Sequence, residues 1–521
     1  MIIKKVVSIV AVLISHHGVS QHHFQEFRVY PYLLNPDKNK ITINWITEDA
    51  QPGEIIVYSS DNDTITKISQ PVLIEALNYS VLEIEKNEKF PDMFSDFNYK
   101  HSVTFDNLKA GNHYQFLVKQ AGEVYQADFK TAPTPESSEK IRLIVLADSE
   151  TDPAGRKSYR KWQPGSQHPE STGRPDSIRH YYLTETEGYR ENIKVIKQQT
   201  PDLILMPGDL VQGGGYQRAW DEFFIHNAGK FDNLFSFVPV LPALGNWENF
   251  GARNGGYDPI AVQKSRAKFI SYFNASPNNN PAYQNCYYRV DYGKITILTL
   301  DSSNGLPDST DADTNININQ STYPGDDLPD FNPGSDQWQW TMEQLQDASA
   351  MGQILFVQFH HIPYSSGGHS LPLSVSGSTG QAGIPMRIYT PYFKQYGVVA
   401  VFCGHNESFE HSLVDGIHFF DTGVAGDGLG YSMQSDDPRF INPWQQWVAH
   451  KDEPELWQGQ QLISGGKHYG HLQVDIEKVK KDQYSVTFIP VHIFPVVDAE
   501  GHLLDAERRE YSHKSILQIN K

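Results

Sequence analysis

The sequence predicts a two-domain chain in which an all-β sandwich precedes an α/β domain built of stacked layers. Three observations lead to this fold class. The length of 521 residues exceeds the ~250–300 residues at which a single hydrophobic core stops growing. Residues 21–131 hold short alternating runs that are typical of antiparallel strands. From residue 141 onward, continuous apolar runs alternate with helical stretches.

The N-terminal domain is predicted from β-branched and aromatic runs that are separated by turn residues. Strands this short and this closely spaced are typical of a sandwich. Residues 132–140 contain prolines and small polar residues, which indicates a linker to the second domain. The strands are expected at 41–47, 54–60, 101–105, 113–120 and 124–131.

The second domain, residues 141–521, is predicted to hold strands that are buried on both faces, because they read as unbroken apolar runs. Helices are expected at 185–199, 261–273 and 336–348, and the run 484–494 is expected to complete the sheet. This alternation predicts an α/β layered domain. The apolar runs are 141–147, 202–206, 238–244, 295–300, 354–359 and 398–403.

Residues 1–20 have the pattern of a cleaved secretory signal peptide. A basic start precedes an apolar run from Val6 to Ile14, and small residues follow before Gln21. The run is far shorter than the ~20 residues that a membrane-spanning helix needs. The alternative interpretation is a buried first strand. We therefore expect a secreted or periplasmic protein with no membrane span.

The net charge of −19 is that of an acidic protein. Such a surface repels polyanions, so no nucleic-acid partner is expected. A small phosphorylated substrate remains compatible, because a bound metal ion reverses the local charge. The chain has two cysteines, Cys286 and Cys403, and no Cys/His zinc pattern; Cys403 ends an apolar run and is expected to be a buried thiol.

Several of the apolar runs end in residues that bind metal ions. In open α/β sheets, ligands bind beyond the carboxyl ends of the strands, so these residues are expected to meet at one edge. A carboxylate has two oxygens and can bridge two cations, while amide oxygens and neutral imidazoles complete a coordination shell. The residues are Asp148, Asp209, Asn246, His360 and His405.

The ordered motifs resemble those of the calcineurin-like metallophosphoesterases, and within them the purple acid phosphatase-like branch. HHIPYSSGG (360–368) and YGVVAVFCGHNESFEH (396–411) look like the last two motifs of that branch. ITINWIT (41–47) and the FKTAP ending near residue 131 resemble its fibronectin-III-like domain. The resemblance implies a metallophosphoesterase β-sandwich flanked by helices, in αββα layers, behind an all-β fibronectin-III-like domain.

The resemblance also implies roles for the strand-end residues. Asp209 would bridge two metal ions, and Asp148 would bind the first of them. Asn246, His360 and His405 would complete the second site, with His361 as a neighbour that is the alternative to His360. A hydroxide bound by both ions would attack a phosphate mono- or diester, with Asp209 among the catalytic residues.

Four residues depart from the family pattern, three of them at positions that the family uses for metal ligands. Glu150 and Glu407 stand where histidines are common, and Gln212 stands where purple acid phosphatases have a tyrosine. If both glutamates are ligands, the first site is all carboxylate and favours a hard cation such as Ca, Mg, Mn or Fe. We therefore expect a mixed centre, whose second ion, bound by histidine and asparagine, is Zn, Mn or Fe.

Trp247 occupies the position at which the family's GNHE motif supplies a proton-donating histidine. Tryptophan does not protonate an alkoxide, so another general acid is needed. The candidates are His361, His369 and Glu248. In the alternative interpretation, Trp247 forms an aromatic wall for the substrate and nothing replaces the histidine.

Basic residues cluster in the segment 156–180, which begins with Arg156 and follows the first metal motif. We expect it to bind a substrate anion, as we do Arg253; the alternative is a solvated basic loop. The function predicted is a secreted metal-dependent phosphoesterase. The alternative is a catalytically degenerate protein of the same fold that binds a phosphorylated or sulfated ligand.

Overall fold

The computed structural model describes most of the chain. The expected signal peptide, the basic segment 156–180 with Arg156, and residues 304–328 lie outside the described residues. The described residues are 26–59, 63–87, 97–151, 184–303, 329–367, 369, 383–429, 441–449, 455–466 and 468–521.

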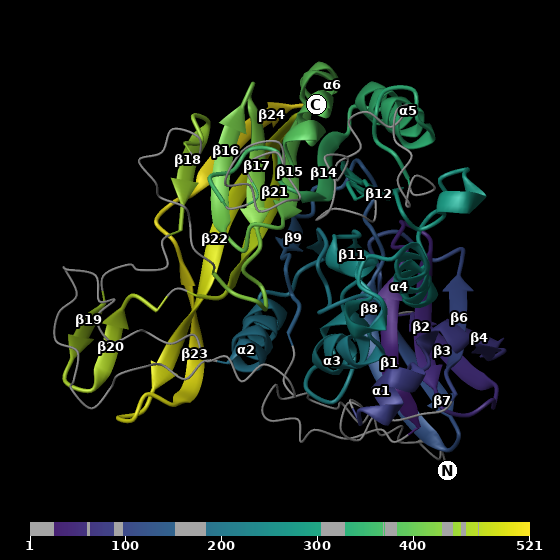
Figure 1. The fold of residues 1–521 in the computed structure, drawn as a ribbon. Helices are drawn as coiled ribbons and strands as arrows, with labels where there is room; N and C mark the ends of the chain where they lie inside the picture. The colour runs from purple at the N-terminus through teal and green to yellow at the C-terminus, as the bar shows by residue number, and fades with distance from the viewer. Residues whose placement is uncertain are drawn as a thin grey trace, which may run out of the picture.

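The N-terminal part of the described chain forms two four-stranded antiparallel sheets (Figure 1). Burial alternates residue by residue along β8, as expected when one face meets a core and the other meets water. Trp45, Phe105 and Phe116 are fully buried in this core. In order, one sheet contains β1 (Phe27–Leu34), β2 (Ile41–Thr47), β6 (Tyr99–Phe105) and β5 (Val72–Leu73), and the other contains β4 (Thr64–Ser69), β3 (Gly53–Ser59), β7 (His113–Gln120) and β8 (Glu123–Lys130).

The rest of the described chain is built around two seven-stranded sheets. A separate hairpin pairs β19 (Leu456–Gln458) with β20 (Gln461–Ser464). The first large sheet has the order β11 (Val240–Pro242), β10 (Leu203–Met206), β9 (Ile141–Val145), β21 (Gly470–Lys480), β22 (Gln483–Val497) and β23 (Leu503–Glu510), with β24 (Ser515–Asn520) also paired to β22. The second has the order β12 (Tyr288–Tyr292), β13 (Ile295–Thr299), β14 (Ile354–His361), β15 (Val398–Gly404), β17 (Ile417–Thr422), β16 (Phe409–Val414) and β18 (Gln445–Val448).

The two large sheets pack face to face. One apolar cluster joins Leu143 and Leu205 of the first sheet to Ile297, Phe356 and Phe402 of the second. Helices cover the outer faces (Figure 1). The expected αββα layering is therefore confirmed. Helices α2 (Glu185–Gln198) and α3 (Gln217–Asn227) lie on the side of the first sheet, and α5 (Asp336–Ala350) and α6 (Thr390–Tyr396) on the side of the second.

Helix ends follow from local sequence. Thr184 accepts a hydrogen bond from the backbone N–H of Glu187, and the Glu187 side chain accepts one from the backbone N–H of Thr184. This capping box begins α2 at Glu185. The Ser335 side chain caps α5 by accepting a hydrogen bond from the backbone N–H of Trp338.

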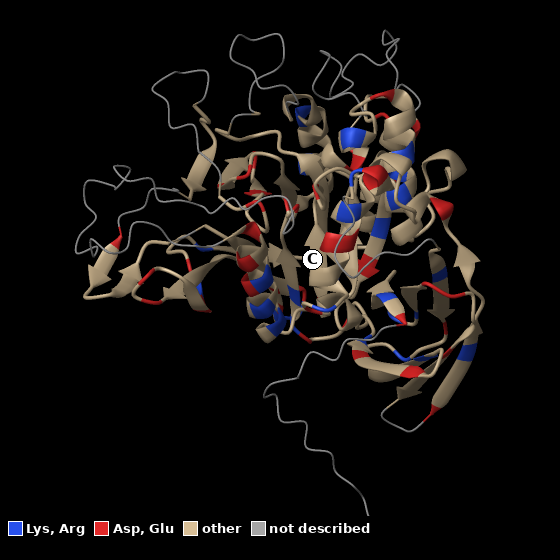
Figure 2. Ribbon diagram, turned by 60° about the horizontal axis from the view of Figure 1, so that its bottom comes forward, with Lys and Arg blue, Asp and Glu red and all other residues tan. Residues whose placement is uncertain are grey.

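The N-terminal sandwich packs on helices of the second domain. Arg28 of β1 forms a buried ion pair with Asp221 of α3. The Tyr32 hydroxyl donates to the carbonyl of Tyr272, at the end of α4 (Pro259–Tyr272), over 2.6 Å. Acidic and basic residues are interspersed along the helices (Figure 2). Among the described residues, no helix is both long and apolar enough to cross a membrane.

The direction of the strands decides where the site forms. Strands β9, β10 and β11 run parallel to one another. Strands β13, β14, β15 and β17 also run parallel. Each sheet therefore gathers the carboxyl ends of several strands at one edge, and the residues that follow those ends come together.

Candidate metal centre

Four of the predicted ligands stand just beyond their strands at positive φ, and one of them is Glu407, with φ of 45°. Asp148, Asp209 and His405 have φ of 54°, 51° and 85°. Non-glycine residues rarely adopt this conformation, and strain of this kind clusters at functional sites. The turns are tight: a Cβ added at Gly245 would lie 2.2 Å from Asp209 Oδ1. This close approach requires glycine beside Asn246.

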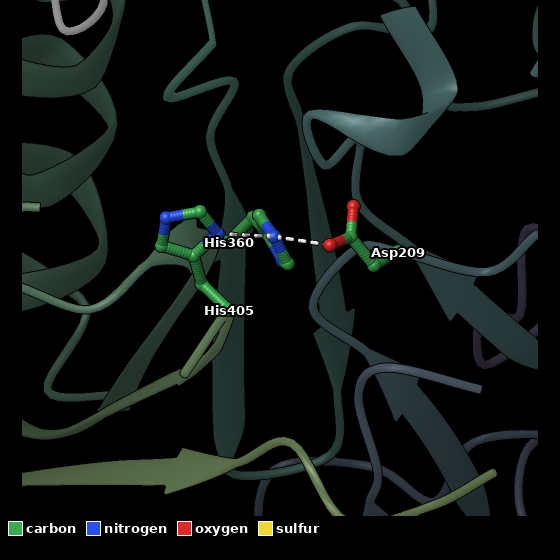
Figure 3. Close-up of side chains that lie close together, drawn as sticks. All are labelled: Asp209, His360 and His405. Atoms are coloured by element: carbon green, nitrogen blue, oxygen red, sulfur yellow. Dashed lines mark hydrogen bonds and ion pairs between the residues drawn. The ribbon is translucent and has the colours of Figure 1, made fainter. Parts of the chain in front are cut away.

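His360 lies at the centre of the cluster (Figure 3). Its Nε2 lies 2.8 Å from Asp209 Oδ2, 2.9 Å from Asn246 Oδ1 and 3.2 Å from His405 Nδ1. The backbone N–H of His405 donates to Asp148 Oδ2 over 2.9 Å. The structure thus brings together all five residues expected at the strand ends.

The tautomer of His360 shows what this cluster is suited to hold. Its Nδ1 lies 3.0 Å from the carbonyl oxygen of Pro207, which can only accept a hydrogen bond. In the neutral imidazole the proton is therefore on Nδ1, and the Nε2 lone pair faces the oxygens of Asp209 and Asn246. Burial lowers the pKa of His360, but the carboxylates of Asp209 and Asp148 raise it, to about 9. A raised pKa means that these oxygens favour a proton on His360 Nε2. A metal cation in the same place would meet the same oxygens and the free Nε2 lone pair.

A second group of acidic side chains adjoins this cluster. Glu150 is 3 % exposed, and its Oε2 is buried without a hydrogen-bond partner in the described part of the chain. Burial raises the pKa of Glu150, and the carboxylates of Asp209, Asp148 and Asp427 raise it further. Burial likewise raises the pKa of Asp148, with Asp209 and Glu407 adding to the effect. Crowded buried carboxylates with an unsatisfied oxygen fit a bound cation.

Asp427 was not predicted from the sequence. It follows β17 in a loop whose backbone N–H groups at Gly426 and Asp427 donate to the carbonyl of Asp148, over 3.0 and 3.1 Å. That loop carries no motif; the signal that would have found it is an acidic residue flanked by glycines, soon after a buried strand. Residues available to a hard cation are therefore Asp148, Glu150, Asp209, Glu407 and Asp427.

Glu248 joins the two loops that carry Asp209 and Asn246. Its Oε2 accepts from the backbone N–H of Asp209 and Gly245, over 2.9 and 2.7 Å, and its Oε1 accepts from that of Leu210 over 2.8 Å. The side chain is fully buried. Within the described part of the chain its hydrogen-bond partners are all backbone donors, so Glu248 positions the site and is not placed to protonate a leaving group.

The cluster opens into a cavity of about 240 Å³. His369 lines this cavity, and its ring centroid lies 4.2 Å from that of His405. Its backbone N–H donates to Asn406 Oδ1 over 2.8 Å. The residues that line the cavity are Asp148, Glu150, Asp209, Asn246, Trp247, Phe250, Tyr257, His369, His405 and Glu407.

Three of the predicted site residues that the structure describes, His360, His361 and Arg253, lie outside this lining. His361 is fully buried, and its Nδ1 lies 2.7 Å from Ser302 Oγ. Of the two adjacent histidines, it is thus His360 whose Nε2 meets Asp209 and Asn246. Arg253 is exposed on the short 3₁₀ helix Ala252–Asn254. Arg156 lies outside the described residues.

Residues 173–406 match the sequence model of the family described as Calcineurin-like phosphoesterase. The chain therefore carries a calcineurin-like phosphoesterase domain, and its resemblance to this family is confirmed. The matched range includes four of the five strand-end residues, Asp209, Asn246, His360 and His405, while Asp148 lies before it.

Solved structures show the same fold. The purple acid phosphatase PPD1 from yellow lupin (Lupinus luteus) seeds superposes with a TM-score of 0.58 at 16% identity, over 92% of this chain and 74% of that chain. The structure of PhoD superposes with a TM-score of 0.58 at 13% identity, over 95% of this chain and 91% of that chain. At these identities the likeness establishes the metallophosphoesterase fold.

The curated relatives match only part of the chain. The uncharacterized proteins Rv2577 and MT2654 of Mycobacterium tuberculosis, strains H37Rv and CDC 1551, are each 26% identical over 274 residues. The match covers 51% of this chain and 45% of each relative. The chain thus spans less than half the length of the curated relatives it matches.

Proposed function

We propose that this protein is a metal-dependent phosphoesterase that hydrolyses phosphate mono- or diesters with two cations, and that it acts outside the cytoplasm after loss of a signal peptide. The observation that carries the proposal is the convergence on His360 Nε2. Oxygens of Asp209 and Asn246 and a nitrogen of His405 lie within 2.8–3.2 Å of it. Acceptor atoms that point at one another in this way suit a cation.

The donor atoms divide between two ions. His360, His405 and Asn246 suit a transition metal such as Zn, Mn or Fe, whereas Asp148, Glu150 and Glu407 suit a hard cation such as Ca, Mg, Mn or Fe. We assign Asp209 to both sets. Its Oδ2 faces His360, and its carboxylate is close enough to Asp148 and Glu150 to raise the pKa of both.

When bound, the two ions supply activation of a water molecule and neutralise the charge on the phosphate. The chain supplies the rest. The carbonyl of Pro207 fixes the ring orientation of His360, and the Asp148 carboxylate holds the backbone N–H of His405. Water adds to phosphorus, the bond to the leaving oxygen breaks, and that oxygen takes up a proton. His369 is the cavity-lining group that we assign to deliver it.

The test is hydrolysis of p-nitrophenyl phosphate and bis(p-nitrophenyl) phosphate by the purified chain. Turnover is measured with added Mn²⁺, Ca²⁺, Zn²⁺ or Fe, before and after chelation. We expect turnover that a chelator removes and metal restores, and that Asp209→Asn abolishes. Elemental analysis of protein purified without added metal should show a hard ion beside a transition metal.

Two outcomes contradict the proposal in different places. Two equivalents of zinc with no harder ion would overturn the mixed centre and leave the phosphoesterase assignment standing. Absence of chelator-sensitive turnover with every metal would instead favour the degenerate protein that binds a phosphorylated or sulfated ligand.

A further inference from the structure

One side of the metal-site cavity is aromatic. Trp247, Phe250 and Tyr257 line it together with the metal-binding residues, and all three are partly exposed. The rings contact one another in sequence: the Trp247 and Phe250 centroids lie 5.2 Å apart, and those of Phe250 and Tyr257 lie 4.9 Å apart. A phosphate held at the metal-binding residues leaves this aromatic side for the organic part of the ester.

The loop that carries these rings is held rigidly by backbone hydrogen bonds. The N–H of Gly214 donates to the carbonyl of Trp247 over 2.7 Å, and the N–H of Gly215 donates to that of Phe250 over 3.1 Å. A Cβ at Gly214 would lie 2.5 Å from the carbonyl oxygen of Glu248, so the two loops meet this closely only through glycine. The rings are therefore in place before a ligand arrives, which lowers the entropic cost of binding.

The ring geometry favours a flat ligand. The planes of Trp247 and Phe250 are 88° apart. A planar ring that stacks on one of them therefore lies perpendicular to the other, and stacked and perpendicular pairs are both preferred aromatic arrangements. A sugar would instead need several hydrogen-bonding side chains, but among the described residues, apart from the metal-binding residues and the three aromatic ones, His369 alone lines the cavity.

We infer that the substrate is a phosphate ester whose organic group carries a flat aromatic ring, and that Trp247, Phe250 and Tyr257 select it. This inference rests on the proposed function only in calling the ligand a substrate. Binding of the aromatic ring does not depend on turnover. Aryl phosphates and nucleotides share the chemistry, since a phenyl ring and a nucleobase both offer a π-face.

The test uses phosphonates, which bind as phosphate esters do but are not hydrolysed. Binding of phenylphosphonate, cyclohexylphosphonate and methylphosphonate to the Mn²⁺-supplemented full chain is measured by calorimetry. We expect phenylphosphonate to bind about 10-fold more tightly than methylphosphonate, with the cyclohexyl compound between them. Equal affinities of the phenyl and cyclohexyl compounds, or of the phenyl and methyl compounds, would overturn the inference.

Variants locate the selectivity. Trp247→Ala keeps the backbone N–H that binds Asp209 and should bring the phenyl-to-methyl affinity ratio close to one, as should Phe250→Ala. Tyr257→Phe keeps its ring and should keep the ratio. The matched control is Tyr392→Ala, which removes an exposed aromatic ring of α6 that packs on Trp338 away from the cavity. A ratio that survives Trp247→Ala and Phe250→Ala would contradict the assignment.

A turnover experiment distinguishes the two sources of the ring. The kcat/KM for adenosine 5′-monophosphate is compared with that for ribose 5-phosphate, and the kcat/KM for phenyl phosphate with that for methyl phosphate. Each ratio is divided by the same ratio in Trp247→Ala, because phenoxide leaves more readily than methoxide whether or not the ring is recognised. A high ratio in the first pair assigns the aromatic side to nucleobases, and a high ratio only in the second assigns it to aryl esters. Ring discrimination in binding without turnover would remove the proposed function and leave this inference standing, and turnover without discrimination would do the reverse.

Discussion

The carboxylate of Glu248 accepts a hydrogen bond from the backbone N–H of Asp209 over 2.9 Å. Through its bonds to Leu210 and Gly245 it also ties the loop of Asp209 to the loop of Asn246. Both loops carry metal-binding residues, so one buried side chain sets the distance between two strand ends. Glu248 is a positioning residue, although its sequence position beside Trp247 makes it a candidate acid.

Replacing Glu248 should therefore lower kcat/KM to a similar extent for all substrates, whatever their leaving group. In Glu248→Ala, four backbone donors lose their acceptor and both loops are free to shift. A displacement of this kind costs on the order of 100-fold in kcat/KM. Glu248→Gln should be nearly as damaging, because its amide group presents N–H to an N–H donor. Metal content by elemental analysis should fall in both variants. A loss confined to substrates with poor leaving groups, with full metal content, would instead mark Glu248 as the acid.

The two glutamates that stand where the family commonly has histidine should determine which metal the first site retains. The double variant Glu150→His/Glu407→His replaces two hard oxygen ligands with imidazoles, which suit zinc better. After dialysis against equal Zn²⁺ and Mn²⁺, the variant should hold more zinc and less manganese than the wild-type protein, as measured by elemental analysis. An unchanged metal ratio would show that Glu150 and Glu407 do not bind the ion.

The strand-end residues could be found from the sequence because parallel buried strands leave a strong signal. An unbroken apolar run followed by glycine and a polar residue marks both the strand and the place where its ligand stands. Helix α3, Gln217–Asn227, leaves no such signal: all but one of its residues are buried, polar ones such as Gln217, Asp221 and Glu222 included, so no polar face separates from an apolar one. It was therefore missed.

The aromatic side of the cavity escaped prediction for a different reason. Trp247 was noticed because it replaces a residue of a motif, but Phe250 and Tyr257 belong to no motif. Backbone hydrogen bonds around Gly251 and Gly256 bring them back toward the site, including one of 2.7 Å from the N–H of Gly251 to the carbonyl of Gly256. Such non-periodic turns depend on contacts with a distant loop, which a single sequence does not show.

The effect of replacing His369 on kcat should depend on the leaving group of the substrate. Of the two histidines offered as acids, it lines the cavity, while His361 is buried against Ser302. His369→Ala should lower kcat on an alkyl phosphate by about 100-fold, the lower end of general acid catalysis, because an alkoxide needs a proton as it leaves. The p-nitrophenolate leaving group needs little help, so kcat on p-nitrophenyl phosphate should change much less. Equal losses on both substrates would clear His369 of this role.

The buried ion pair between the two domains should stabilise the fold as a pair. Arg28 Nη2 donates to both oxygens of Asp221, over 2.8 and 2.7 Å, and the side chains are 1% and 0% exposed. The Tyr79 hydroxyl also donates to Asp221. Arg28→Met leaves a buried carboxylate without its cation, a loss of about 3–5 kcal/mol in the free energy of unfolding. Arg28→Met/Asp221→Leu should lose less, because no charge is left unpaired.

Urea unfolding followed by tryptophan fluorescence measures both variants. The matched control is Lys119→Met, which breaks an exposed ion pair with Glu54 at 2.8 Å and should leave the midpoint unchanged. A double variant that is less stable than Arg28→Met alone would contradict this expectation, because it would show that the unpaired Asp221 carboxylate is not what destabilises Arg28→Met.

A chain of three histidines should make the fold sensitive to acid. His411 Nε2 lies 2.9 Å from His418 Nδ1, and His411 Nδ1 lies 2.9 Å from His513 Nε2. The His411 ring also lies flat against Phe420, with centroids 4.4 Å apart. Burial, with the neighbouring His418 and His513, lowers the pKa of His411 to about 3. Burial and His513 lower that of His418 to about 4, and burial lowers that of His513.

These shifts determine the sign of the pH dependence. The ordinary histidine pKa is 6.5, so as the pH falls below that value the unfolded chain takes up protons that the folded chain does not. Stability is therefore unaffected above pH 6.5 and falls with acidification, by about 1.4 kcal/mol per pH unit for each such histidine. His411→Gln keeps a donor and an acceptor but cannot be protonated. Its free energy of unfolding, measured in urea between pH 6 and 4.5, should fall less steeply than that of the wild-type protein. The difference in slope should correspond to the uptake of about one proton fewer on unfolding. The control is His113→Gln, which replaces an exposed histidine of β7 and should keep the wild-type slope. An unchanged slope in His411→Gln would contradict the prediction, because it would mean that His411 is protonated as readily in the folded chain as in the unfolded one.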